Sequence, residues 1–322
     1  MRPFLALLLT AASLHAQAPG VPVYPEGRGN TPQTALIEKA RALLEAKKLL
    51  TEAQRNAQML RKTCTATLPA ANTQPLSGRQ LWERARAAHL RIGHLYLCNK
   101  CDKWHLDLAG GYVLTADGVA GTCAHVLPPP AQTRESYLVA ATDDAVVLPI
   151  TEILAVNQAT DSAILRVQSD KPLTPLPLSS DVSPGDEVWC FSDPSGKRGY
   201  YSEGIVSRFV QRPFLRKREQ TKLNVDKATL EKPVWVETTV EWAPGSSGSA
   251  VMDAKGNLVG HVSEIQAVLE DPPPARAGKK KTETTEDAAK QPPPYTPGTY
   301  IVFHQAIAAS ELRKLIQEPK KP

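Results

Sequence analysis

The sequence predicts an all-β fold between about Leu95 and Phe303, with helical segments on either side. Over this stretch, short runs rich in β-branched and aromatic residues alternate with turns that contain Gly, Asp or Pro. The chain has 322 residues, of which 42% are hydrophobic and 22% are charged. Since all-β domains of about 200 to 250 residues are common, the composition predicts one large globular domain with polar extensions.

The first extension, residues 1–18, is typical of a secretory signal peptide. An apolar run from Phe4 to Leu14 follows one arginine, and small residues suited to a cleavage site lie at Ala16 and Ala18. The run is shorter than the ~20 apolar residues that a membrane-spanning helix needs. We therefore expect a periplasmic or secreted protein with no integral membrane segment after signal removal.

Residues 19–92 are predicted to form a helical extension ahead of the β domain. Thr31 is typical of a helix N-cap, and apolar residues then recur at helical spacing as far as Leu60, which predicts one amphipathic helix. Ser77 and Gln80 form the pattern of a capping box that begins a second helix. An apolar helix face must be buried, so we expect docking on the β domain, with self-association or partner binding as the alternatives.

Three motifs within the β domain carry the residue types that acyl transfer needs. Two apolar runs around an Asp-Gly turn predict a hairpin that ends near His125. Asp161 leads into an apolar strand, and Ser247 lies in a turn of small residues next to Gly248. Together they supply a base, an orienting acid and an uncrowded hydroxyl. Each motif alone is weak, because lone histidines, strand-initial aspartates and Gly/Ser turns are usually structural.

In this order, the motifs resemble those of the chymotrypsin-fold, trypsin-like serine proteases, and especially the bacterial Deg/HtrA-like branch. Residues 109–126, 160–165 and 245–250 are similar to the histidine, aspartate and nucleophile segments of that family. Residues 185–196 and 202–207 are similar to its interdomain hairpin. The resemblance implies two six-stranded antiparallel β-barrels, with an active site between them and a C-terminal helix. It covers the protease domain only, and no PDZ-like segment is recognised.

The resemblance also implies an activity, that of a serine endopeptidase that hydrolyses peptide bonds of polypeptide substrates through an acyl-enzyme. His125 would be the base, Asp161 would fix its tautomer, and Ser247 would attack the carbonyl. The backbone N–H groups of Gly245 and Ser247 would form the oxyanion hole. Such chemistry is expected to use no cofactor and no metal. The alternative is a catalytically latent protease-fold protein that binds ligands or acts as a sensor in the cell envelope.

The residues that would bind substrate are less clearly indicated. Glu241 stands where trypsin-like relatives place the base of the primary specificity pocket, and an acid there could favour Lys or Arg substrates. Strand alternation instead places Glu241 opposite the face of Val240, which makes a solvated glutamate at least as well supported. Another strand resembles the substrate-pairing strand of the family, so its backbone is expected to bind the peptide main chain: His261, Val262 and Ser263.

The chain has five cysteines, and in an exported protein they predict a disulfide, with at least one cysteine left over. Cys98 and Cys101 precede the histidine hairpin, and either could bridge to the other or to Cys123. A zinc set of these three with His105 is less favoured, because zinc ligands usually come in two short clusters. A thioredoxin-like redox role is least favoured, since no βαβ pattern surrounds the pair.

The remaining features concern charge and the C-terminal part of the chain. A formal net charge of +5 is too modest to predict nucleic-acid binding without a concentrated stripe of basic and aromatic residues. Residues 270–296 are rich in Pro, Lys, Glu and Thr and predict a flexible insertion. A strand at 299–304 and a closing helix at 306–317 follow, which places the protease domain at 93–318 and leaves a short tail at 319–322.

Overall fold

The computed structural model describes residues 21–24, 31–214, 231–270 and 298–319. The predicted signal peptide and all but the first residue of the predicted insertion lie outside the described residues, as does most of the tail. Among the described helices, none combines the length and apolar character that crossing a bilayer requires.

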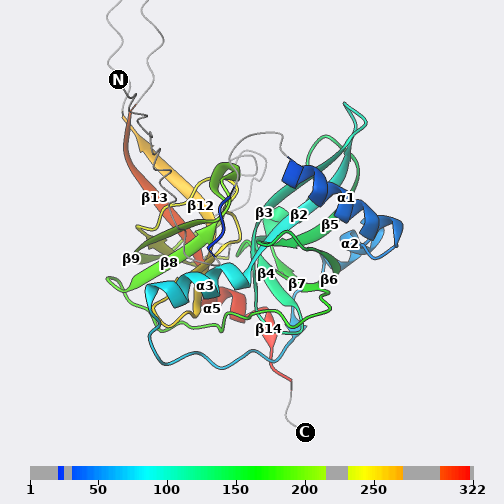
Figure 1. The fold of residues 1–322 in the computed structure, drawn as a ribbon. Helices are drawn as coiled ribbons and strands as arrows, with labels where there is room; N and C mark the ends of the chain where they lie inside the picture. Colours follow the sequence, from blue (N-terminus) through cyan, green and yellow to red (C-terminus); the bar gives the residue numbers. More distant parts are fainter. Residues whose placement is uncertain (1–20, 25–30, 215–230, 271–297, 320–322) are drawn as a thin grey trace, which may run out of the picture.

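Two closed six-stranded antiparallel barrels form the body of the protein, which confirms the predicted all-β double barrel (Figure 1). The first barrel has the strand order β2-β3-β4-β7-β6-β5 and begins at His89, ahead of the predicted boundary at residue 93. Its strands are β2 (His89–Cys98), β3 (Trp104–Val113), β4 (Val119–Thr122), β5 (Thr133–Thr142), β6 (Val147–Asn157) and β7 (Ser162–Val167).

The second barrel has the strand order β10-β13-β12-β11-β8-β9. Its β12 and β13 extend beyond the barrel as a long two-stranded ribbon (Figure 1). The strands are β8 (Glu187–Ser192), β9 (Tyr200–Gln211), β10 (Val234–Thr238), β11 (Ala250–Asp253), β12 (Leu258–Leu269) and β13 (Thr299–Ala308).

Each barrel has its own apolar core, and a third cluster joins the two barrels. Ile92 and Leu165 lie in the core of the first barrel, and Val236 lies in that of the second. The joining cluster includes Tyr112 of β3 and Phe191 of β8. This shared cluster fixes the two barrels relative to each other.

The predicted N-terminal helix is two helices, α1 (Thr31–Glu45) and α2 (Glu52–Gln58). The break follows from Lys47, whose φ of 56° is incompatible with a continuing helix, and from Thr51, which caps α2 with a capping box. Leu36 of α1 is buried against the first barrel in a cluster with Leu95 and Val139. Docking on the β domain is therefore how α1 buries its apolar face.

The other helices lie beneath the junction of the barrels (Figure 1). The capping box of Ser77 and Gln80 begins α3 (Gly78–Ala88), as predicted. The predicted closing helix is shorter than expected, since α5 spans only Ala309–Arg313. Residues 306–308 instead continue β13, because all three pair with β12 and Ala306 and Ile307 also pair with β10. The short strand β14 (Ile316–Gln317) pairs in parallel with β1 (Cys64–Thr65).

Candidate active site

The loop that carries Ser247 connects β10 to β11, and two glycines at positive φ determine its path. Gly245 has φ 104° and Gly248 has φ 84°, which a side chain would strain. A Cβ atom on Gly248 would lie 2.4 Å from Gly110 O and 3.1 Å from Cys123 N, so the loop packs directly on the first barrel. Gly110 N also donates to Ser247 O at 2.7 Å. These contacts bring Ser247 close to the segment that leads into His125.

His125 lies in a short 3-10 helix (Ala124–Val126) that follows β4, and Asp161 holds it in two places. The backbone N–H of His125 donates to Asp161 Oδ1 at 3.0 Å, and its Nδ1 lies 2.8 Å from Asp161 Oδ2. Because a carboxylate can only accept, Nδ1 carries the proton, and Nε2 of the neutral ring keeps its lone pair. The His125 side chain is 18% exposed, so the ring is fixed in orientation and still reachable.

Asp161 is buried, immediately precedes β7 and has a left-handed backbone conformation, with φ 46°. Ser263 Oγ donates a further hydrogen bond to its Oδ2 at 2.6 Å. Burial would raise the pKa of Asp161, but the hydrogen bonds from His125 and Ser263 outweigh it and hold this pKa below its usual value. The carboxylate is therefore charged at neutral pH.

His261 of β12 connects this network to the first barrel. Its Nε2 lies 3.1 Å from Asp161 O, and its Nδ1 lies 3.2 Å from the Tyr112 hydroxyl. A carbonyl can only accept, so Nε2 donates and Nδ1 accepts from Tyr112. Burial lowers the pKa of His261, which keeps the ring neutral and consistent with this tautomer. The His261 side chain thus links the second barrel to Tyr112 and Asp161 of the first barrel.

The two N–H groups assigned to the oxyanion hole lie in the same loop as Ser247. In the described chain, neither Gly245 N nor Ser247 N donates to another backbone group. Neighbouring groups are bonded, since Ser246 N donates to Ala243 O at 3.0 Å and Gly248 N donates to Val262 O at 2.7 Å. Bonds on either side therefore fix a loop in which these two N–H groups have no backbone acceptor among the described residues.

Comparison with known proteins relates this chain to serine proteases. Residues 109–260 match the model of the trypsin-like peptidase domain. The chain carries a trypsin-like peptidase domain. Similar proteins include mitochondrial serine protease HTRA2 of Bos taurus, 31% identical over 47% of this chain and 30% of the relative. Serine protease PepD of Mycobacterium tuberculosis is 30% identical over 64% of this chain and 42% of the relative. A probable periplasmic serine endoprotease DegP-like of Halomonas elongata is 26% identical over 49% of this chain and 30% of the relative. The chain thus spans less than half the length of these relatives.

The strand expected to pair with substrate is partly engaged inside the peptidase domain. Val262 O accepts from Gly248 N at 2.7 Å and from Cys123 Sγ at 3.0 Å, and Val262 N donates to Ser249 O at 2.9 Å. Ser263 stands at a register shift between β12 and β13 and has no ladder partner among the described strands. The Val262 peptide groups are therefore bonded within the protein, and pairing of the His261–Ser263 strand with a peptide stays a prediction.

Glu241 is exposed, while its neighbours Val240 and Trp242 are buried. The predicted alternation of burial is present, although β10 ends at Thr238, before these residues. Its carboxylate accepts a hydrogen bond from the Tyr200 hydroxyl at 2.9 Å. This environment is that of a solvated surface glutamate, and a role in substrate specificity stays a prediction.

Several residues of this network were not predicted from the sequence. The Ser263 hydroxyl, the Tyr112–His261 contact and the Cys123 thiol were not assigned these contacts. The alternation of β12 places His261 and Ser263 on one face, so the sequence could have indicated that Ser263 lies on the same side as His261. The Tyr112 contact depends on how the barrels face each other, which no local pattern encodes.

The disulfide expectation is not met by the structure. No disulfide joins any of the five cysteines, all of which lie in the described part of the chain. Cys123 Sγ donates to Val262 O and lies with the His125 and Asp161 side chains, whereas Cys98 and Cys101 group with His105. The expected bridge to Cys123 is therefore absent, and the less favoured zinc set with Cys123 does not assemble either, because Cys123 follows β4 and lies beside His125 and Asp161.

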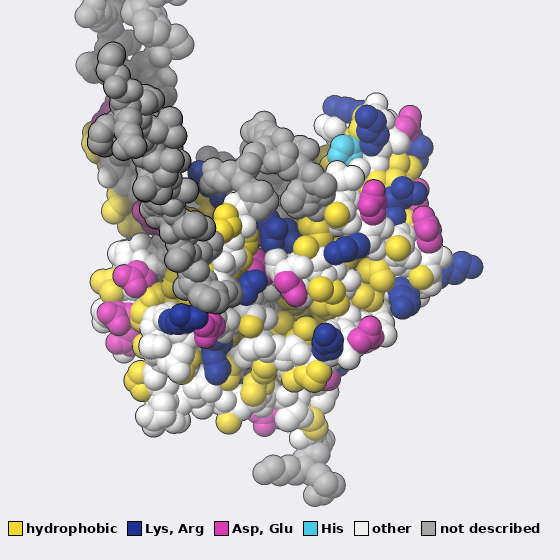
Figure 2. Space-filling view, viewed as in Figure 1, with side chains coloured by type: hydrophobic (Ala, Val, Ile, Leu, Met, Phe, Trp, Pro, Cys, Tyr) yellow, Lys and Arg dark blue, Asp and Glu magenta, His cyan; other side chains and the backbone are white. Residues whose placement is uncertain are grey.

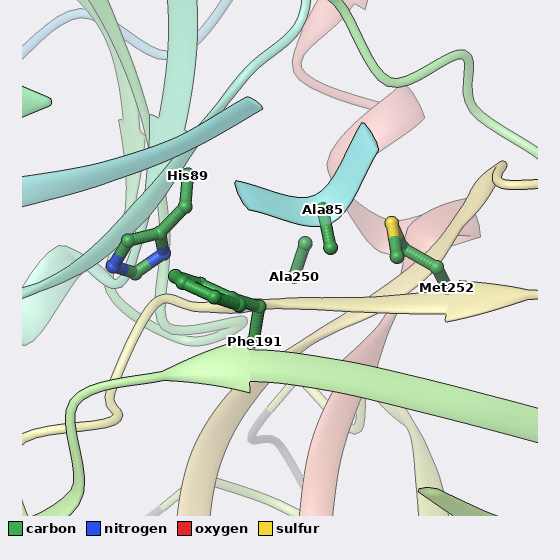
Figure 3. Close-up of a pocket in the computed structure, with 5 residues that line it drawn as sticks. All are labelled: Ala85, His89, Phe191, Ala250 and Met252. Carbon is green, nitrogen blue, oxygen red and sulfur yellow. The ribbon is translucent and has the colours of Figure 1, made fainter. Parts of the chain in front are cut away.

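A small hollow lies beneath α3 at the junction of the barrels (Figure 3). The His89 ring meets Phe191 edge-on, with 5.2 Å between ring centroids. The lining is otherwise aliphatic, and none of its residues belongs to the Asp161 network. This hollow is a packing feature of the joining cluster and not part of the candidate active site. The lining residues are Ala85, His89, Phe191, Ala250 and Met252.

Proposed function

We propose that this protein is an HtrA-type serine endopeptidase in which His125, Asp161 and Ser247 form the catalytic triad. The observation that carries the proposal is that the Asp161 carboxylate accepts hydrogen bonds from both the backbone N–H and Nδ1 of His125, at 3.0 and 2.8 Å. These bonds leave the lone pair of Nε2 to act as the base. The packing of Gly248 against the segment that leads into His125 supports Ser247 as its partner.

In the proposed reaction, Ser247 Oγ attacks the peptide carbonyl while His125 Nε2 takes its proton. The charged Asp161 carboxylate stabilises the imidazolium, which then gives the proton to the leaving amine. Water attacks the acyl-enzyme in the same way, with His125 again as base, and releases the acid product and Ser247. The N–H groups of Gly245 and Ser247 would stabilise the oxyanion, a contribution of about 10² to 10³ in turnover for each donor.

Polypeptides are the proposed substrates, because the relatives are all named as proteases. The main chain of the substrate would pair with the backbone of Ser263, next to the Ser263 hydroxyl that holds Asp161. We place the protein in the periplasm or outside the cell. Support comes from the apolar N-terminal run in the sequence and from the periplasmic relative of Halomonas elongata.

Labelling of the purified full chain with a serine-directed fluorophosphonate tests this proposal. The wild type and Ser249→Ala should both react, because Ser249 Oγ is buried and has no hydrogen-bond partner among the described residues. Ser247→Ala should not react. A folded wild type that resists labelling and cleaves no unfolded protein would instead favour the latent, ligand-binding alternative.

A further inference from the structure

The turn between β2 and β3 gathers two thiols and an imidazole far along the strands from the Asp161 network. Cys98, Cys101 and His105 each offer one ligand atom, and the three atoms lie within 4.8 Å of one another. Cys101 Sγ and His105 Nε2 lie 3.0 Å apart. The cluster contains the residue types that bind Zn²⁺ best, and none of them takes part in the proposed proteolysis.

The backbone of this turn holds the first sulfur in place. Cys98 N donates to Lys103 O at 3.0 Å and closes the turn, while Asp102 takes the left-handed conformation with φ 53°. Lys100 N points back to Cys98 Sγ at 3.4 Å. A backbone N–H directed at sulfur favours the thiolate, which is the form that binds a metal.

The imidazole is oriented by its cross-strand neighbour. His105 of β3 pairs with Tyr96 of β2, and the two rings stack with 5.4 Å between centroids and 24° between planes. This stacking directs Nε2 toward the thiols. A disulfide between the cysteines would have no need of a histidine held in that position.

The cluster is reachable from solvent at the outer end of the first barrel. Cys98 is buried, His105 is partly buried and Cys101 is exposed, so one side faces water. Figure 2 shows basic and acidic side chains interspersed with apolar ones over the face of the molecule that it views. Because Cys101 is exposed and His105 is partly buried, an incoming ion can reach the cluster, and a fourth coordination position would remain for water.

We propose that Cys98, Cys101 and His105 form a zinc site, with two thiolates, one imidazole nitrogen and an open fourth position. Sulfur and imidazole ligands favour Zn²⁺ over the oxygen-seeking Mg²⁺ and Ca²⁺. Binding releases the two thiol protons to solvent and involves no oxidation. The bound ion would clamp the end of the β2–β3 hairpin.

Cobalt(II) added to the reduced full chain without oxygen is the probe, because it reports thiolate ligation by colour and is displaced by zinc. We expect one cobalt ion per chain with thiolate-to-metal absorption, and loss of that absorption on addition of zinc. Cys98→Ser and Cys101→Ser should lose most of the absorption. Loss of a residue that only hydrogen-bonds to a metal ligand weakens metal binding by about 10- to 100-fold. Because His105 would bind the ion directly, His105→Gln should weaken binding by more than this.

Three controls separate this site from the rest of the molecule. Cys64→Ser removes a thiol outside the cluster, and Cys123→Ser removes the thiol beside His125 and Asp161. Both should bind cobalt as the wild type does, and so should Ser247→Ala, whatever the outcome for proteolysis. A reduced wild type that shows no thiolate-to-cobalt absorption would overturn the zinc site. So would Cys98→Ser and Cys101→Ser variants that keep full affinity, or loss of binding in Cys123→Ser alone.

Discussion

At the scale of single residues, Asp161 is where both barrels meet in one carboxylate. It receives hydrogen bonds from His125 of the first barrel and from Ser263 of the second, and its carbonyl accepts from His261. Burial of an unpaired carboxylate would be costly, but these donors hold it in the charged form. The same contacts that stabilise the charge also orient the His125 ring, so fold and proposed catalysis depend on one side chain.

Asp161→Asn keeps the size of the side chain but replaces one acceptor oxygen by an NH₂ group. The amide oxygen can replace only one of the two carboxylate oxygens, so the NH₂ group faces either His125 N or the pair of His125 Nδ1 and Ser263 Oγ. The second placement favours the wrong imidazole tautomer. We expect kcat to fall by about 10⁴. The measurement is cleavage of an unfolded protein or fluorogenic peptide, with circular dichroism to confirm folding. A loss of less than tenfold would remove Asp161 from the proposed mechanism.

Ser263→Ala removes one donor to Asp161 and leaves the His125 contact in place. We expect a smaller loss of kcat than in Asp161→Asn, because His125 N and Nδ1 still bond to the carboxylate. Hydrogen bonds to charged groups contribute about 1.5 to 3 kcal/mol, which corresponds to roughly 10- to 150-fold at most. Ser263→Thr, which keeps a hydroxyl, should recover part of the activity. Equal damage in both variants would argue for lost packing instead.

The individual residues show what the sequence could and could not predict. His125, Asp161 and Ser247 each stand in a recognisable local context, and their order along the chain carried the resemblance. The expectation of a disulfide was wrong, because it came from the expected export of the protein. The strands place Cys98 and Cys123 in different groups of side chains, which the sequence does not show. Local patterns identify residue types well, but partners across two barrels depend on three-dimensional placement.

At the scale of elements, the loop between β10 and β11 depends on close backbone approach. Gly248 has φ 84° and lies so near β3 that an added Cβ would be 2.4 Å from Gly110 O. The Gly110–Ser247 hydrogen bond crosses the same contact. Space at this glycine therefore determines where Ser247 lies relative to the first barrel.

Gly248→Ala should destabilise the protein and displace Ser247. The positive φ alone costs an alanine about 1 to 3 kcal/mol, and the clash with Gly110 O adds to it. The matched control is Gly185→Ala, which has a φ of 97° but open space around its Cβ position. Denaturant unfolding and fluorophosphonate labelling should show a larger loss of stability, and a loss of labelling, only in Gly248→Ala. Equal effects of the two variants would contradict the packing argument.

The helices were predicted with mixed success, for physical reasons. The apolar stripe that predicted docking is real, since Leu36 is buried on the first barrel. The break between α1 and α2 was missed, because a lysine at positive φ, as at Lys47, has no sequence signature comparable to glycine. Pairing with β12 extends β13 through Ala308 and shortens the closing helix, which only the sheet register reveals.

Leu36→Ala tests the docking of α1. Leu36 is 3% exposed, and removal of such a side chain costs about 2 to 5 kcal/mol. Leu60→Ala is the control, because Leu60 is 76% exposed and its loss should change the free energy of unfolding by less than about 0.5 kcal/mol. Denaturant unfolding should show this difference at every protein concentration. A difference that depends on concentration would indicate that the helix is buried between chains instead.

At the scale of the whole molecule, the two barrels were predicted at two levels of detail. Residue patterns alone indicated an all-β domain, while the number of barrels and strands came from the resemblance. The barrel cores follow from alternation along each strand, but the joining cluster around Tyr112 and Phe191 combines segments far apart in sequence. Its arrangement, and with it the polar network above it, required the folded structure.

Buried histidines make the stability of this molecule sensitive to acid. Burial lowers the pKa of His89, His94 and His261, and that of His94 falls to about 4, with the nearby Arg55 charge contributing. Each is protonated more readily when unfolded, near pH 6.5, than when folded. The unfolded state therefore binds more protons between these pKa values, and stability falls as pH decreases through that range. The lowered pKa of Asp161 acts in a different range, because its stabilisation is lost only on acidification below about pH 4.

His94→Gln isolates one part of this acid sensitivity. Glutamine can still donate to Leu127 O, which His94 Nε2 contacts at 3.0 Å, but it does not titrate. With a folded pKa of about 4, His94 accounts for about 2 kcal/mol of the stability lost between pH 7 and pH 5. Denaturant unfolding at both pH values should show that the variant loses about 2 kcal/mol less than the wild type on acidification. If the variant and the wild type lose equal stability between pH 7 and pH 5, the pKa of His94 is not lowered in the folded protein.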